Sequence, residues 1–184
     1  MILLVGGPPR VGKSTLAALL LERDGLPHCP TDALVSMLQH AAPALGVRHG
    51  EHASKAAAAL PFLVEFLRAI ADGIDHEDPL DGYVVEGDVI TLDAVAAARA
   101  TGLPVAPVFL GDTTLTAERL RLDPQWLEGA PDAVYRDTAA RVRDRSTALR
   151  DACRAAGAPF VDLGDGAGFG AGLERARALL LPGR

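Results

Sequence analysis

Asparagine is absent from this chain of 184 residues, and lysine occurs only twice, at Lys13 and Lys55. Regulatory GTPases normally recognise guanine with an Asn-Lys-x-Asp motif, so the missing asparagine argues against a Ras-like GTPase. Cysteine is also scarce, because only Cys29 and Cys153 are present and they lie far apart. This spacing predicts neither a disulfide framework nor a zinc site.

Long apolar runs are missing too, since no stretch approaches the roughly 18 residues of a membrane span. The net charge is −6, and all basic residues except the two lysines are arginine. A negative chain with scattered arginines argues against general nucleic-acid binding. Met1 leads directly into a predicted strand, which leaves no room for a signal peptide. We therefore expect a cytoplasmic protein that binds neither membranes nor nucleic acids.

One segment near the start of the chain matches the phosphate-binding loop pattern G-x-x-x-x-G-K-[ST] at every fixed position. Its residues are Gly7, Pro8, Pro9, Arg10, Val11, Gly12, Lys13 and Ser14, followed by Thr15. An apolar strand precedes the loop and a helical segment follows it, so backbone N–H groups and the helix dipole converge on one spot. The pattern predicts that Lys13 reaches the β- and γ-phosphates of ATP and that Ser14 binds Mg²⁺.

Short apolar runs alternate with helical stretches along the chain, which is typical of a parallel sheet covered by helices on both faces. The predicted strands are Ile2–Val5, Leu26–Cys29, Tyr83–Glu86, Val105–Leu110 and Pro159–Leu163. The predicted helices are residues 14–21, 32–38, 53–71, 91–100 and 131–156. Pro61 should kink the third helix or divide it in two. Thr31 or Asp32 should cap the second helix.

The length favours a single domain over residues 1–184. Residues 33–80 form a long connection between the second and third strands, and residues 111–145 form a lid-like segment. A glycine-rich stretch, residues 164–172, does not fit a dinucleotide fingerprint in any register. We expect a mobile loop there.

Three carboxylates lie near the predicted carboxyl edge of the sheet, where ligands bind in open parallel sheets. Asp32 follows the second strand and could accept the proton of a substrate hydroxyl that attacks the γ-phosphate. Glu86 and Asp88 end the third strand, where a carboxylate would hold water on Mg²⁺. Glu86 is our first choice for this metal role and Asp88 the second.

The chain resembles P-loop small-molecule kinases, a group that includes nucleoside monophosphate, gluconate, shikimate and chloramphenicol kinases. The resemblance rests on the loop from Gly7 to Thr15, on Thr31-Asp32, on Val85-Glu86-Gly87 and on the segment 118–121. It is closer to proteins described as 2-phosphoglycerate-kinase-like, through residues 125–127, 143–146 and 157–162. It implies a three-layer α/β/α fold with a mostly parallel five-stranded sheet in the order 2-3-1-4-5. It also implies ATP and Mg²⁺ as cofactors.

Planar arginine side chains suit the equatorial oxygens of a transferred phosphoryl group. The candidates are Arg119, Arg121, Arg136 and Arg143. We assign Arg119 and Arg136 to catalysis with Lys13 and Asp32, and Arg121 to nucleotide binding. The resemblance further implies that Arg48, His49, His52 and a Phe62/Phe66 face shape the acceptor pocket.

The predicted function is transfer of the γ-phosphate of ATP to a hydroxyl of a small metabolite or natural product, by a monomer or homodimer. Two alternatives remain open at this stage. One is a nucleoside or nucleotide kinase, and the other is a P-loop ATPase or nucleotide-binding regulator that phosphorylates no small molecule.

Overall fold

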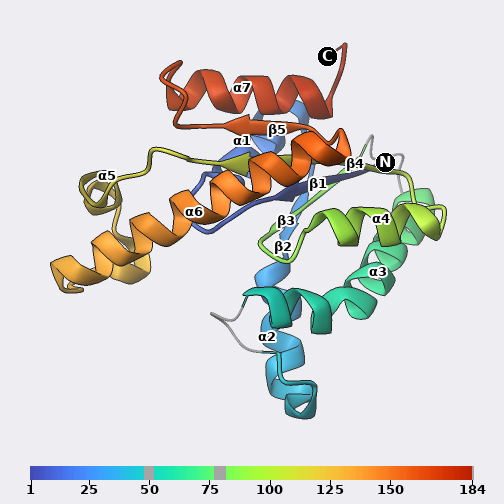
Figure 1. Cartoon of the computed structure of the whole chain (residues 1–184). Coiled ribbons are helices and arrows are strands. Elements are labelled where there is room, and N and C mark those ends of the chain that lie inside the picture. Colours follow the sequence, from blue (N-terminus) through green and yellow to red (C-terminus); the bar gives the residue numbers. More distant parts are fainter. Residues whose placement is uncertain (48–51, 77–81, 184) are drawn as a thin grey trace.

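The computed structural model describes residues 1–47, 52–76 and 82–183. Its centre is a five-stranded sheet in the order β2-β3-β1-β4-β5 (Figure 1). Every neighbouring pair of strands is parallel. The strands are β1 (Ile2–Gly6), β2 (His28–Pro30), β3 (Tyr83–Gly87), β4 (Val105–Gly111) and β5 (Phe160–Asp162). The predicted fold class and strand order are confirmed.

Among the described residues, seven α-helices and two 3-10 turns connect these strands or, in the case of α7, follow the last of them. The helices are α1 (Lys13–Asp24), α2 (Thr31–Ala41), α3 (His52–His76), α4 (Leu92–Ala100), α5 (Ala117–Leu122), α6 (Asp132–Ala156) and α7 (Phe169–Leu180). None of the helices described here is long and apolar enough to cross a membrane.

The sheet divides the core in two, because successive residues of a strand face opposite sides. Leu3 and Val5 of β1 belong to one buried cluster together with residues of α1 and α7. Ile2 and Leu4 belong to the other, together with residues of α3 and α4. Figure 1 shows α7 on one side of the sheet and α4 on the other. The strand β1 is therefore apolar on both faces, which explains its continuous apolar run.

The long helix α6 agrees with the predicted helix 131–156 and buries one stripe of its surface. Tyr135, Ala139, Val142 and Ser146 are all buried, and the helix ends at Gly157 in a left-handed conformation with φ of 64°. Its residues pack along β4 and β5. This packing brings the second half of α6 close to the phosphate loop.

Pro61 lies inside α3, which runs on as one element, so of the two expected outcomes the division into two helices is wrong. In Figure 1 the axis of α3 changes direction part-way along, which agrees with the expected kink. Two other local expectations need correction. The residue before α2 is Pro30, and no side chain caps this helix. The glycine-rich stretch is only partly a loop, because α7 begins at Phe169.

Candidate active site

The phosphate loop connects β1 to α1 and depends on glycine at two positions. Gly7 has φ of 143°, and a Cβ atom there would overlap the carbonyl oxygen of Leu110. Gly12 has φ of 84°, and its Cβ would lie 2.8 Å from the Cζ atom of Phe169. Side chains would therefore push the loop away from β4 and α7. The backbone is free to curve around an anion at the N-terminus of α1.

Lys13 and Ser14 begin α1 beside carboxylates of neighbouring strands. Lys13 Nζ donates a hydrogen bond to the carbonyl oxygen of Pro8 at 2.8 Å. Burial lowers the pKa of Lys13, while the charges of Glu86, Asp88 and Asp32 oppose this shift. A phosphate that approaches a partly desolvated ammonium stabilises its charged form, because the anion restores the electrostatic stabilisation that burial removes. This environment fits the terminal phosphates of a nucleotide.

Glu86 is 5% exposed and lies at the end of β3. Its Oε1 atom accepts a hydrogen bond of 2.9 Å from Ser14 Oγ. Mg²⁺ usually takes one or two protein oxygens and completes its shell with phosphates and water. A hydroxyl and a carboxylate in contact at the phosphate loop fit this requirement. No larger cluster of His, Cys, Asp or Glu that could hold a metal occurs among residues 1–47, 52–76 and 82–183.

Asp88, the second candidate for the metal, makes different contacts. Lys55 Nζ donates to its two carboxylate oxygens at 2.9 and 2.7 Å, and His52 Nδ1 lies 3.7 Å from Oδ2. Burial of the carboxyl acts to raise its pKa, but His52 and Lys55 together hold the pKa of Asp88 well below its usual range. Asp88 is therefore an ionised group whose charge is balanced by the buried Lys55.

Different residues of the phosphate loop line two cavities. The first, here called the α1 cavity, has a volume of about 230 Å³. It is lined by Gly12 to Thr15 and by side chains from the lid-like segment, Arg119 among them. The second, here called the α6 cavity, has a volume of about 400 Å³ and is lined by Gly7, Pro8, residues 90–93 and one side of α6. Lys13 lines the α1 cavity, and its Nζ atom donates to the carbonyl oxygen of Pro8, which lines the α6 cavity.

The arginines of the α1 cavity are paired with aspartates. Arg119 forms an ion pair of 2.8 Å with Asp112, whose side chain is almost fully buried. Arg10 forms an ion pair of 3.7 Å with Asp123 and also donates to the carbonyl oxygen of Asp123. The phosphate loop is thus tied to the lid-like segment by one arginine and one aspartate. A bound nucleotide would lie next to both guanidinium groups.

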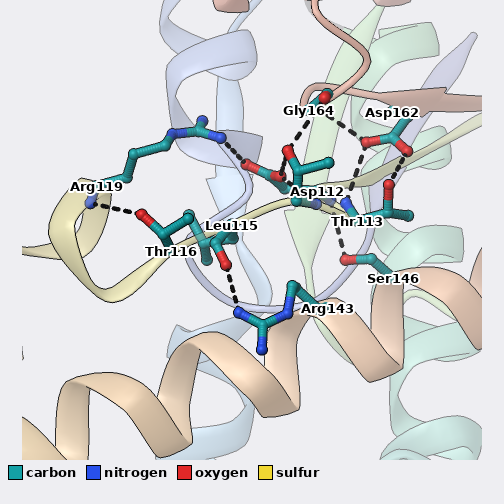
Figure 2. Close-up of polar contacts among 10 residues, drawn as sticks. Asp112, Thr113, Leu115, Thr116, Arg119, Arg143, Ser146, Asp162 and Gly164 are labelled. Atoms are coloured by element: carbon teal, nitrogen blue, oxygen red, sulfur yellow. Dashed lines mark hydrogen bonds and ion pairs between the residues drawn. The ribbon is translucent and has the colours of Figure 1, made fainter.

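A hydrogen-bond network fixes the base of the lid-like segment (Figure 2). The Asp112 N–H donates to Ser146 Oγ at 3.0 Å, and the Thr113 side chain donates to Asp162 at 2.5 Å. Arg143 Nη1 donates to the carbonyl oxygen of Leu115 at 2.7 Å. The network joins the ends of β4 and β5 to α6. Arg143, a sequence candidate, has a structural partner here.

The remaining predicted residues are placed less centrally. Asp32 lies in the first turn of α2, is exposed and lines neither cavity, although its charge acts on Lys13. Arg121 pairs with Glu118 and Asp132 and stacks on Tyr135. Arg136 is exposed on α6. Arg121 and Arg136 also lie outside the residues that line the two cavities.

Of the residues that were expected to shape the acceptor pocket, only some line a cavity. His52 lines the α6 cavity, whereas Phe62 is exposed and Phe66 packs against the core. Arg48 and His49 lie outside the described residues. Sequence reasoning missed Lys55, which pairs with Asp88, and Arg145, which lines the α6 cavity. The sequence has only two lysines, and Lys13 belongs to the phosphate loop. The rarity of lysine could therefore have drawn attention to Lys55.

No protein-family model and no curated protein matches this chain. Solved structures do match. A gluconokinase from Sinorhizobium meliloti 1021 is 20% identical with a TM-score of 0.54, over 99% of this chain and 97% of the other. A shikimate kinase from Bacteroides thetaiotaomicron is 17% identical with a TM-score of 0.56, over 98% of each chain. The fold is that of P-loop small-molecule kinases. The resemblance drawn from the sequence is confirmed at this level.

Proposed function

We propose that this protein transfers the γ-phosphate of ATP to a hydroxyl group of a small metabolite. The observation that carries the proposal is that different residues of one phosphate loop line two cavities, Gly7 and Pro8 in the α6 cavity and Gly12 to Thr15 in the α1 cavity. The α1 cavity contains the groups that suit a nucleotide's phosphates, and the α6 cavity has room for a small second substrate. Two cavities that share one phosphate loop are what a direct transfer between two bound molecules requires.

The α1 cavity supplies the groups for phosphate and Mg²⁺. Lys13 would balance charge on the β- and γ-oxygens, and Ser14 and Glu86 would hold Mg²⁺, whose chemistry is to neutralise the same oxygens. Arg119 adds a planar cation beside the nucleotide. The α1 cavity is too small for a whole nucleotide, so the base and ribose lie partly outside it, toward the lid-like segment.

Asp32 is proposed as the proton acceptor. The acceptor's hydroxyl oxygen forms a bond to the γ-phosphorus while the bond from phosphorus to the β-phosphate's bridging oxygen breaks, and ADP leaves. The hydroxyl proton passes to the Asp32 carboxylate. Asp32 lies outside the linings of both cavities and is exposed, it makes no hydrogen bond to the described residues, and its charge acts on Lys13. Asp88 is less suited to this role, because Lys55 keeps it ionised.

Replacement of Lys13 tests the proposal. We expect Lys13→Ala to lower ATP-dependent phosphorylation by roughly 10²–10³-fold, the usual loss when one transition-state charge partner is removed. Phosphorylated products from a panel of hydroxylated metabolites would be detected by mass spectrometry. Because burial disfavours the Lys13 charge, the variant should unfold at the same or a higher temperature. Unchanged turnover in Lys13→Ala would refute the proposal.

Arg99→Ala provides a matched control. Arg99 is exposed on α4 and lines neither cavity. This variant also removes one cation, so it reports any general effect of net charge on ATP binding. It should retain wild-type turnover.

A further inference from the structure

The α6 cavity combines apolar walls with a few charged groups near the phosphate loop. Ile90, Leu92, Ala148, Leu149 and Ala152 form the apolar part of the lining. The charged or titratable side chains are Arg145, Asp88, His52 and Asp93. Cavities of this kind recognise a ligand through the few polar groups that they hold. The balance of these charges therefore indicates the chemistry of the acceptor.

The negative charges of this lining are already neutralised or solvated. Asp88 accepts two hydrogen bonds from Lys55, whose side chain is only 4% exposed, and His52 lies beside the same carboxylate. Asp93 is exposed in the first turn of α4, where the helix dipole favours an acid. Neither carboxylate is left to balance a further cation within the cavity.

Arg145 is that further cation. It is half-buried, and no hydrogen bond or ion pair joins it to any described residue. Burial lowers the pKa of its guanidinium, and the charge of Asp88 only partly opposes this shift. The two arginines of the α1 cavity differ, because Arg119 and Arg10 each have an aspartate partner. A partly desolvated guanidinium without a partner is a costly arrangement unless a ligand supplies the anion.

We propose that the acceptor carries an anionic group, a carboxylate or a phosphate, in addition to the hydroxyl that is phosphorylated, and that Arg145 binds this group. The inference rests on the proposed function and names the substrate class of the same site. A guanidinium offers paired N–H donors that match the oxygens of either anion. A neutral acceptor of the same shape would leave Arg145 desolvated and unpaired, so it is rejected.

Arg145 could instead contact the transferred phosphoryl group, since its charge also lowers the pKa of Lys13. The two roles affect different kinetic constants. An anchor for the acceptor affects the KM of the acceptor, whereas a contact made only in the transition state affects kcat. The kinetic test below uses this difference.

The first experiment measures anion binding without knowledge of the acceptor. Protein saturated with Mg²⁺ and the non-hydrolysable analogue AMP-PNP is heated with increasing acetate or sulfate, at ionic strength kept constant with chloride. Wild type should show a saturable rise in melting temperature that is absent in Arg145→Met. Acetate alone would indicate a carboxylate, and sulfate alone would indicate a phosphate. General stabilisation by sulfate is the same in every variant and cancels.

Arg150→Met is the matched control. Arg150 lies on the same helix, pairs with Asp151 and is not part of the cavity lining. This variant should bind the anions as the wild type does, and Arg145→Lys should retain part of the effect. Equal anion stabilisation in wild type and Arg145→Met would overturn the inference. If AMP-PNP itself does not bind to the wild type, the proposed function fails instead.

The second experiment compares acceptors in pairs. Hydroxy acids and phosphorylated alcohols are tested against their amides and parent alcohols. The charged member should be the better acceptor, and Arg145→Met should lower its kcat/KM by about 10²-fold, mainly through KM. The KM for ATP should not change. A neutral or cationic acceptor, or a loss confined to kcat, would overturn the inference.

Discussion

The ion pair between Lys55 and Asp88 is open to a quantitative test. Both side chains are largely buried, at 4% and 16% exposure, and two hydrogen bonds of 2.9 and 2.7 Å join them. Removal of one partner from a buried pair costs about 3–5 kcal/mol, because the other charge stays desolvated. We take the lower end, about 3 kcal/mol, since His52 still lies beside Asp88 when Lys55 is replaced.

We expect the free energy of unfolding to fall by a large amount in Lys55→Met and by a smaller amount in the double variant Lys55→Met/Asp88→Asn. For a chain of this length, about 3 kcal/mol corresponds to a fall in melting temperature of roughly 6–12 °C. Urea unfolding followed by circular dichroism would give the free energies of all four members of the cycle. The exposed pair of Arg68 and Glu65 on the same helix is the control, and Arg68→Met should cost about 0–0.5 kcal/mol.

The direction in which pH changes the stability difference between wild type and Lys55→Met follows from the pKa of Asp88. In wild type the pKa of Asp88 is lowered, so its contribution is present above the usual aspartate pKa, near 4, and is lost as the pH falls below that value. In Lys55→Met the contributions of Lys55 that lower the pKa of Asp88 are lost, so this pKa is higher than in wild type. The variant should then recover stability, relative to wild type, as the pH falls through the pKa that Asp88 has in the variant. If Lys55→Met costs no more than Arg68→Met at pH 7, the assignment of a buried charge pair is refuted.

Two further predictions concern the neighbourhood of Asp32. Asp32→Asn should lower kcat by roughly 10²–10⁴-fold, the usual contribution of a general base, and leave AMP-PNP affinity unchanged; normal turnover with weakened AMP-PNP binding would make Asp32 a nucleotide-side residue instead. Gly87→Ala should cost about 1–3 kcal/mol, because its Cβ would overlap Thr31 Oγ1. Gly73→Ala, where nothing lies within 4 Å, should instead stabilise α3 by about 0.5–1 kcal/mol. Equal melting temperatures for the two alanine variants would refute the close approach of Gly87 to Thr31.

The phosphate loop and the core strands could be predicted from the sequence because their signals are local. The loop has fixed glycines at fixed spacing, and each strand is a short apolar run. The strand order 2-3-1-4-5 was not readable from these patterns and came from the resemblance to kinases. The helix α7 was missed because glycines at its start obscured an apolar repeat at Leu173, Ala176 and Leu180, all of which are buried.

The functional arginine could not be selected from the sequence for a different reason. Arg136, Arg143 and Arg145 share one helix, and a rotation of about 100° separates successive residues. The rotation of α6 about its own axis, relative to the sheet, decides which of these arginines faces the phosphate loop. In the structure Arg136 is exposed, Arg143 donates to Leu115, and Arg145 lines the α6 cavity. Only tertiary packing contains that information.

The three acids near Lys13 are distinguished by their partners. Glu86 accepts from Ser14, and Asp88 is held ionised by Lys55. Among the residues that the structure describes, Asp32 has neither kind of partner, and it is exposed at the start of α2. A base in phosphoryl transfer must exchange a proton during turnover, whereas a metal ligand and an ion-pair partner must stay ionised. The same division of roles leaves Arg145 as the cation whose anion must arrive with the acceptor.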